Sequence, residues 1–163
     1  MSTPLIFAIN KIEDENVLLT VIRLLLNFGA NPNVKNYNGW TPLMFASSSG
    51  YTEVAQILLR YNADPNVADK YKHNSLMCTV IGGNKEIVQI LINFGADLNA
   101  KSRLEWTPLM EASYRGNGEI VKMLLNAGAD PNIGDRRGST ALTFAIRNGH
   151  EHVVQIFKQI GAK

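Results

Sequence analysis

Short apolar stretches alternate with polar, turn-forming segments along the whole chain, and the alternation recurs at a fixed interval. The leucines that open four of these stretches are evenly spaced, at Leu43, Leu76, Leu109 and Leu142. The residues that close them keep the same interval, at Gly29, Asn62, Gly95, Gly128 and Gly161. An earlier copy begins at Thr3-Pro4-Leu5 and is a few residues longer than the others. Independent positions that agree on one period predict a tandem array of a single structural unit.

Each unit is expected to contain two short helices. A residue with a capping side chain precedes the first helix in every copy, at Thr3, Thr41, Asn74, Thr107 and Thr140. Proline follows at the first helical position in three copies, where its missing N–H removes no hydrogen bond. The second helix carries apolar residues at helical spacing, for example Val54, Ile57 and Leu58. It ends where glycine, or Asn62, can adopt a left-handed conformation.

The strings GWTPLMFASSSGYTEVAQILLRYNADPNV and EWTPLMEASYRGNGEIVKMLLNAGADPNI resemble ankyrin repeats. The resemblance implies an all-α solenoid of five helix-turn-helix repeats, each of about 33 residues, joined by hairpin-like fingers and capped at both ends. It covers 1–163 as a single domain, with repeats at approximately 1–36, 37–69, 70–102, 103–135 and 136–163. The chain departs from the family pattern at the histidine that usually follows T-P-L, which is Ile6, Met44, Met77, Met110 and Thr143 here. We therefore expect the solenoid to depend more on side-chain packing for its rigidity.

Two further features bear on the fingers and the ends. Lys72 and Glu105 stand where a finger-turn glycine is usual. The sequence alone therefore does not fix the turn conformation of these two fingers. Lys158 replaces the apolar residue of the inner copies, so we expect it to face solvent and to end the stack. In the first repeat, Leu18 and Leu19 have two possible roles. They either fold back to cap the stack, or they form an exposed apolar end that binds another molecule or a second copy of the chain. Capping is favoured, because lone apolar surface residues are ordinary.

Composition narrows the function only a little. Apolar residues make up 45% of the chain and charged residues 18%, which is typical of a globular protein. The net charge of +2 is too small to indicate a nucleic-acid binder. A single cysteine, Cys78, favours a reducing compartment. No apolar run approaches the roughly 20 residues of a membrane span. We therefore expect the cytoplasm, or a host's cytoplasm if the protein is a secreted effector.

No catalytic, metal or cofactor motif emerges, and we expect no enzyme. Catalytic acids must converge on one substrate, whereas Asp64, Asp97 and Asp130 recur one repeat apart. His150 and His152 are two residues apart at a helix start, on different faces, which disfavours a joint metal site. Cys78 lies among apolar residues and is interpreted as a small core residue.

In the ankyrin family, the finger tips and the exposed face of the first helix form a concave surface that binds partners. The resemblance places these residues on that surface: Tyr37, Trp40, Lys70, Tyr71, His73, Arg103, Leu104, Trp106, Tyr114, Arg115, Arg136, Arg137 and Arg147. Tryptophan, tyrosine and arginine dominate binding hot spots. The alternative is that the basic residues only keep the surface soluble and that Trp40 and Trp106 pack against the adjacent finger.

The sequence thus predicts a protein-protein interaction module, monomeric alone, whose partner has an acidic surface and an apolar anchor. Two alternatives stay open. Basic residues interleaved with aromatic ones also suit single-stranded nucleic acid, which would make the chain a nucleic-acid-associated regulatory factor. The chain could also be the targeting arm of a larger enzyme or secreted effector.

Overall fold

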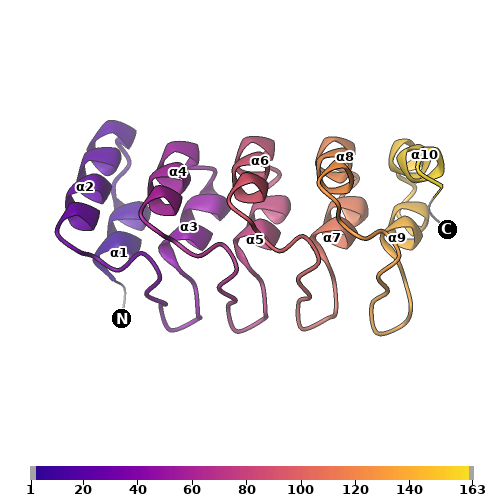
Figure 1. The fold of residues 1–163 in the computed structure, drawn as a ribbon, viewed down its shortest axis with the longest axis horizontal. Helices are drawn as coiled ribbons and strands as arrows, with labels where there is room; N and C mark the ends of the chain where they lie inside the picture. The colour runs from indigo at the N-terminus through magenta and orange to yellow at the C-terminus, as the bar shows by residue number, and fades with distance from the viewer. Residues whose placement is uncertain (1–2, 162–163) are drawn as a thin grey trace.

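The computed structural model describes residues 3–161, which form ten helices and no strand. The helices are α1 (Pro4–Lys11), α2 (Glu15–Asn27), α3 (Pro42–Ser49), α4 (Thr52–Arg60), α5 (Ser75–Gly82), α6 (Lys85–Asn93), α7 (Pro108–Tyr114), α8 (Gly118–Asn126), α9 (Ala141–Arg147) and α10 (Glu151–Gln159). Consecutive helices pack as pairs, and the pairs stand side by side in one row (Figure 1). The predicted all-α repeat solenoid is confirmed.

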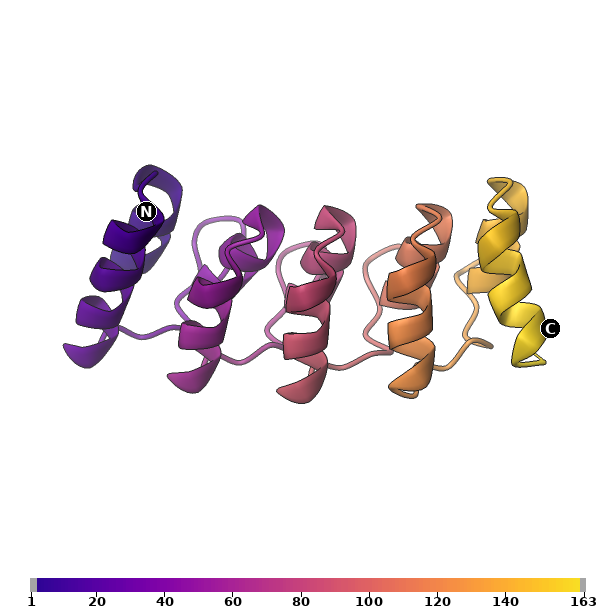
Figure 2. The same cartoon turned by 90° about the horizontal axis from the view of Figure 1, so that it is seen from above.

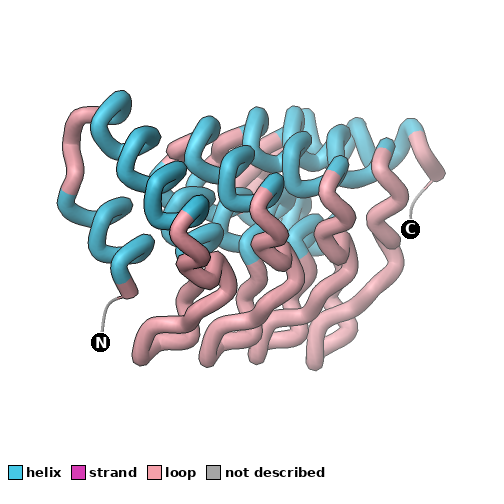
Figure 3. The backbone as a smooth tube through the Cα atoms, turned by 60° about the vertical axis from the view of Figure 1, so that its left-hand side comes forward, coloured by secondary structure: helices cyan, strands magenta, loops and turns pink. Residues whose placement is uncertain are grey.

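The solenoid has two layers of helices and a row of projecting loops. The first helices of the pairs form one layer, and the second helices form the other (Figures 1 and 2). Between pairs the chain leaves the second helix, extends past the first layer and turns back (Figure 3). We call the tips of these loops finger 1 (residues 36–40), finger 2 (69–73), finger 3 (102–106) and finger 4 (135–139).

The capping residues fix where the first helices begin. Thr41 Oγ1 accepts a hydrogen bond from the Met44 amide at 3.3 Å, and Asn74 Oδ1 accepts one from the Met77 amide at 2.9 Å. The N-cap side chains of α1, α7 and α9 accept the equivalent bond. All five predicted caps are therefore confirmed. Each satisfies a backbone amide that the helix leaves without a partner.

Fingers 2 and 3 keep the family turn without its glycine. Lys72 and Glu105 adopt φ values of 61° and 62°, in the same left-handed region as Gly39 at 85° and Gly138 at 74°. For a residue with a Cβ this conformation costs roughly 1–2 kcal/mol. The surrounding finger hydrogen bonds hold the two residues in this conformation. Fingers 2 and 3 therefore keep the turn that glycine forms in fingers 1 and 4.

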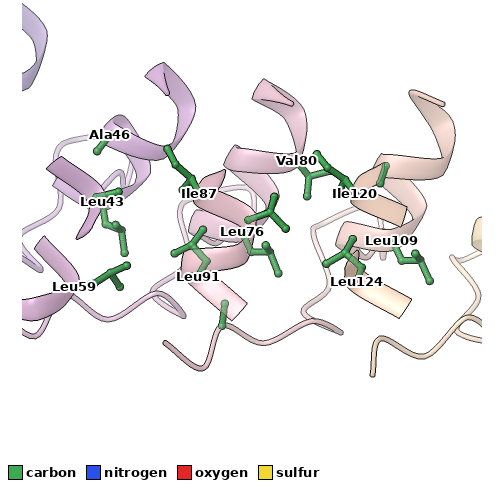
Figure 4. Packing of buried hydrophobic residues seen from close by; sticks show 14 of the residues in the cluster. Leu43, Ala46, Leu59, Leu76, Val80, Ile87, Leu91, Leu109, Ile120 and Leu124 are labelled. Carbon is green, nitrogen blue, oxygen red and sulfur yellow. The ribbon is translucent and has the colours of Figure 1, made fainter. Parts of the chain in front are cut away.

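The core runs the length of the stack as one continuous cluster. Leu43, Leu76 and Leu109 of the first helices are almost completely buried, and so are Leu91 and Leu124 of the second helices (Figure 4). These side chains fill the space between one helix pair and the next. Packing against neighbouring pairs is thus the main source of stability, as expected for a repeat array.

Asparagine side chains also join one repeat to the next. Asn33 Oδ1 accepts from the Asp64 amide at 2.8 Å, while its Nδ2 donates to the Asn62 carbonyl at 3.0 Å. Asn66 makes the same two bonds to the following repeat, at 2.7 and 3.1 Å. Asn99 Oδ1 accepts from the Asp130 amide at 3.0 Å. These bridges supply inter-repeat hydrogen bonds, although the usual histidine is missing.

The two ends of the stack differ. At the C-terminal end the Lys158 side chain is 61% exposed while Phe157 beside it is buried, so the predicted orientation of Lys158 is confirmed. In the first repeat Leu18 is buried and Leu19 is partly buried, as a capping hairpin requires. The same helix, however, leaves apolar side chains exposed, at Val17, Leu24 and Phe28. Leu24 is 51% exposed, whereas its counterpart Ile57, which has a preceding repeat, is 4% exposed. Capping at this end stays a prediction.

The C-terminal end can be tested with Lys158→Leu. We expect this change to create an apolar patch on the exposed end of the stack and to increase self-association at high protein concentration. Sedimentation velocity would measure it, with Lys122→Leu on the exposed side of α8 as the control. A Lys158→Leu protein as monomeric as its parent would contradict the role of Lys158 at this end.

Candidate functional site

Each finger is held rigid by its own first residue. Asp69 Oδ1 accepts hydrogen bonds from the amides of Tyr71 and His73, at 2.7 and 2.8 Å. Its amide also donates to the His73 carbonyl at 2.9 Å. Asn36, Ser102 and Asp135 make the same side-chain bonds in the other fingers. The intervening side chains are thus presented on a fixed backbone.

Backbone hydrogen bonds link neighbouring fingers, with one exception. The Lys70 amide donates to the Asn38 carbonyl at 3.2 Å, and the Arg103 amide donates to the Tyr71 carbonyl at 2.8 Å. Within residues 3–161 the Arg136 amide makes no equivalent bond to finger 3. Instead, Arg136 Nη2 donates to the Arg103 carbonyl at 2.8 Å. Fingers 3 and 4 are therefore joined by a side chain.

Exposed aromatic and basic side chains alternate from finger to finger. The Lys70 Nζ lies 3.7 Å from the centre of the Tyr37 ring, and the Arg103 Cζ lies 5.9 Å from the centre of the Tyr71 ring. Tyr37 and Tyr71 are 81% and 61% exposed. Each pair joins two consecutive fingers through a cation–π contact. These rings are available to a partner.

Both tryptophans also have structural contacts. Trp40 Nε1 donates to Asp69 Oδ2 at 3.1 Å, across to the next finger, and its ring lies 4.9 Å from that of Phe45. Trp106 is half-buried, with its ring centre 4.4 Å from that of Phe144 and 5.4 Å from that of Tyr114. Trp40 thus contacts the adjacent finger, as the alternative expected, whereas Trp106 packs on helices α7 and α9 and not on a finger. Their part in binding stays a prediction.

Three adjoining hollows lie around Leu104 at the tip of finger 3, whose side chain is 65% exposed. The apolar hollow, of about 190 Å³, is lined by Met77, Ile81, Leu104 and Trp106 among others. The arginine hollow, of about 350 Å³, is lined by Leu104, Trp106, Asp135, Arg136, Arg137, Phe144 and Arg147. The Tyr71 hollow, of about 330 Å³, is lined by Tyr71, His73, Ser102, Arg103 and Leu104.

The hollows bring together eight of the predicted residues: Tyr71, His73, Arg103, Leu104, Trp106, Arg136, Arg137 and Arg147. The others lie apart. Tyr37, Trp40 and Lys70 line none of the three hollows, and Tyr114 packs on Trp106. Arg115 Nε donates to Glu111 Oε1 at 2.6 Å, and Arg115 lines a separate hollow with Lys122 and His152. Met77 and Phe144, which also line the hollows, were not among the predicted site residues.

Basic side chains at the tips of fingers 2 to 4 have no carboxylate partner. Within the part of the chain that the structure describes, no carboxylate lies within 4.0 Å of Lys70, Arg103, Arg136, Arg137 or Arg147. The carboxylates of Asp69 and Asp135 accept amides of their own fingers instead. Positive charge therefore remains available at the tips of fingers 2 to 4.

The other titratable groups that the sequence singled out have structural contacts. Asp64, Asp97 and Asp130 each accept the amide two residues on, at 2.8 to 2.9 Å. The Nε2 atoms of His150 and His152 lie 2.9 and 2.8 Å from the carbonyls of Tyr114 and Gly116, in the preceding repeat. Over residues 3–161, no three His, Cys, Asp or Glu side chains are grouped so as to hold a metal ion.

Cys78 is buried in α5, as predicted, and burial followed by the nearby Asp69 charge raises the pKa of its thiol from 9.0 to about 12. We expect native protein at pH 8 to resist a thiol-specific disulfide reagent, because the thiolate is the nucleophile. The same reagent should react at once in denaturant. Between pH 9 and about 12 only the thiol of the unfolded protein ionises, which favours the unfolded state. The free energy of unfolding therefore falls as the pH rises through that range. Rapid labelling of the native protein would contradict this placement.

The two layers, the fingers and the caps define a helical repeat solenoid of the kind that presents a surface rather than an enclosed active site. A family model for ankyrin repeats in three copies matches residues 1–69 and 63–135, and a second model for ankyrin repeats in many copies matches residues 119–157. The chain belongs to the ankyrin-repeat family. No curated protein matches it. Ankyrin repeats are generally protein-protein interaction modules and typically not catalytic. No helix in the described range is long and apolar enough to cross a membrane.

Proposed function

We propose that this chain is a non-catalytic protein-binding module that holds its partner on the finger surface. The observation that carries the proposal is the exposed Leu104, which stands between apolar walls and arginines without carboxylate partners. The thirteen residues predicted from the sequence supply this surface, with the centre at fingers 2 to 4. A complementary partner presents an acidic surface with at least one apolar anchor.

The mechanism is presentation on a rigid frame. The finger backbones are fixed by the side chains of Asn36, Asp69, Ser102 and Asp135, so little backbone entropy is lost when a partner docks. The basic tips steer an acidic partner, and burial of Leu104 and Tyr71 then slows its dissociation. Raised salt should consequently slow association more than it speeds dissociation. We propose that the protein acts as a monomer in the cytoplasm, or in a host's cytoplasm as an effector.

One observation favours a second candidate function. The exposed Tyr37 and Tyr71 rings, each beside a cation, would also suit stacking of single-stranded bases. The small net charge weighs against it. A salt titration with a fluorescent single-stranded oligonucleotide tests this second function, because true phosphate contacts give a steep dependence of affinity on salt. As part of a longer protein, the same surface would serve as a targeting arm.

A displayed library of random peptides tests the protein-binding proposal without a known partner. The parent protein should enrich peptides that combine acidic and apolar residues. Tyr71→Ser and Leu104→Ser variants should fail to enrich them, whereas Gln89→Ala on the exposed side of α6 should enrich the same peptides. Peptides that bind both finger variants as well as the parent would place the binding surface elsewhere, for instance at the exposed apolar face of α2.

A further inference from the structure

The arginine hollow lies at the one junction where two fingers lack a backbone hydrogen bond. Fingers 1 and 2, and fingers 2 and 3, are joined by amide-to-carbonyl bonds, whereas among the described residues the bond between the tips of fingers 3 and 4 runs from Arg136 Nη2 to the Arg103 carbonyl. Leu104 and Trp106 of finger 3 form one wall of the hollow, and residues of finger 4 form the other. Phe144, buried behind Trp106, also lines it. The hollow is therefore apolar on one side and lined by arginines on the other.

Three guanidinium groups line this hollow with most of their donors free. Each guanidinium carries five N–H donors. Arg136 uses one on the Arg103 carbonyl, and Arg147 uses one on Ser139 Oγ at 3.1 Å. The Arg137 side chain makes no hydrogen bond to any described residue. The one acid, Asp135, accepts two amides of its own finger on Oδ1, so three guanidinium groups and one carboxylate leave the hollow with a net positive charge. Arginine forks match the oxygen atoms of carboxylates and phosphates.

The neighbouring apolar hollow offers a different chemistry across the same wall. Leu104 and Trp106 line both hollows, and Met77 and Ile81 complete the apolar one. No arginine lines the apolar hollow, and its one carboxylate, Glu111, is neutralised by Arg115 at 2.6 Å. Two side chains that occupied the two hollows would be separated only by the Leu104–Trp106 wall. In an extended peptide, residues one or two apart are within about 7 Å of each other, so one short segment can present side chains to adjoining hollows.

We propose, on the basis of the protein-binding function above, that the two hollows together read one extended segment of the partner. The segment carries an oxyanion, as a carboxylate or a phosphate, one or two residues from a large apolar side chain. The oxyanion binds Arg136, Arg137 and Arg147 in the arginine hollow. The apolar side chain enters the apolar hollow against Leu104. Recognition therefore requires both groups in one segment, and neither an acidic surface nor an apolar anchor suffices alone.

Pools of short synthetic peptides test this inference by fluorescence polarisation. Each pool fixes leucine or phenylalanine at a central position and, one or two residues before or after it, glutamate, phosphoserine, glutamine or lysine, with the other positions randomised. We expect the glutamate or phosphoserine pools to bind at least about tenfold more tightly than the glutamine pools, and the lysine pools to bind least. The tighter of the two anionic pools identifies the natural oxyanion. Replacing the fixed apolar residue with glycine should abolish binding.

Variants at the hollow separate this inference from the wider proposal. Arg137→Gln should weaken the anionic pools about tenfold or more and leave the glutamine pools unchanged, while Arg60→Gln, an exposed arginine of α4, should change neither. Thermal melts check that both variants stay folded. Equal binding of anionic and neutral pools, binding of no pool, or equal effects of the two arginine variants would overturn the inference. The protein-binding function fails separately, if peptides from the displayed library bind without regard to Tyr71 and Leu104.

Discussion

Replacing Leu91 with alanine is expected to lower the free energy of unfolding by about 2–5 kcal/mol, the range for a leucine that leaves a cavity in a packed core. Leu91 is fully buried in α6, at the middle of the stack. Because each repeat contacts only its neighbours, weakening a central repeat also uncouples the two halves of the array. Urea denaturation followed by circular dichroism should show a lower midpoint and a broader transition than the parent's.

The matched control is Ile160→Ala at the end of α10, where the side chain is 50% exposed. Removing an exposed apolar side chain should change stability by no more than about 0.5 kcal/mol. If Leu91→Ala unfolds with the parent's midpoint and slope, the third repeat is not packed between its neighbours as described.

The second large effect concerns binding. Leu104→Ser is expected to weaken binding of a peptide enriched by the parent protein by about 2 kcal/mol or more, roughly thirtyfold. Leu104 lines all three hollows around finger 3, yet it is 65% exposed and not part of the core cluster. The melting temperature of the variant should therefore stay close to the parent's. Isothermal titration calorimetry and a thermal melt measure the two quantities on one sample.

Trp106→Ala provides the contrast. Its ring packs 4.4 Å from Phe144 and partly against the core, so this change should lower stability as well as affinity. Only Leu104→Ser should lower the affinity without lowering the stability. Full affinity in Leu104→Ser would show that finger 3 is not the centre of the binding surface.

The repeat architecture could be predicted because its signals are local. A threonine or asparagine cap, a glycine at a helix end and apolar residues at helical spacing each act within a few residues, and they agree in every copy. The orientation of Lys158 followed from the same register. Fingers 2 and 3 were harder, since their lysine and glutamate adopt a glycine-like conformation only because Asp69 and Ser102 hold the turn.

The candidate site could be predicted only in part. The register placed Leu104, Arg136 and Arg137 on the fingers, but it could not show that Met77, Ile81 and Phe144 line hollows beside them. Those hollows depend on side chains from three consecutive repeats. The link between fingers 3 and 4 depends on the Arg136 side chain, which donates to the Arg103 carbonyl of finger 3. The structural contacts of the tryptophans depend likewise on partners outside their own fingers, at Phe45, Asp69 and Phe144.

The asparagine bridges run in one direction along the chain, which bears on folding during synthesis. Asn33 and Asn66 each lie on an earlier repeat and bond to backbone groups of the repeat that is made next. A ribosome adds about 5–20 residues per second, so one repeat of about 33 residues emerges in roughly 2 to 7 seconds, whereas a short helix forms in about a microsecond. Each finished repeat therefore holds an amide acceptor and donor ready before its successor leaves the tunnel. The nascent chain can lengthen its solenoid from the N-terminus one docked repeat at a time, and the apolar face of the newest repeat is covered when its successor docks.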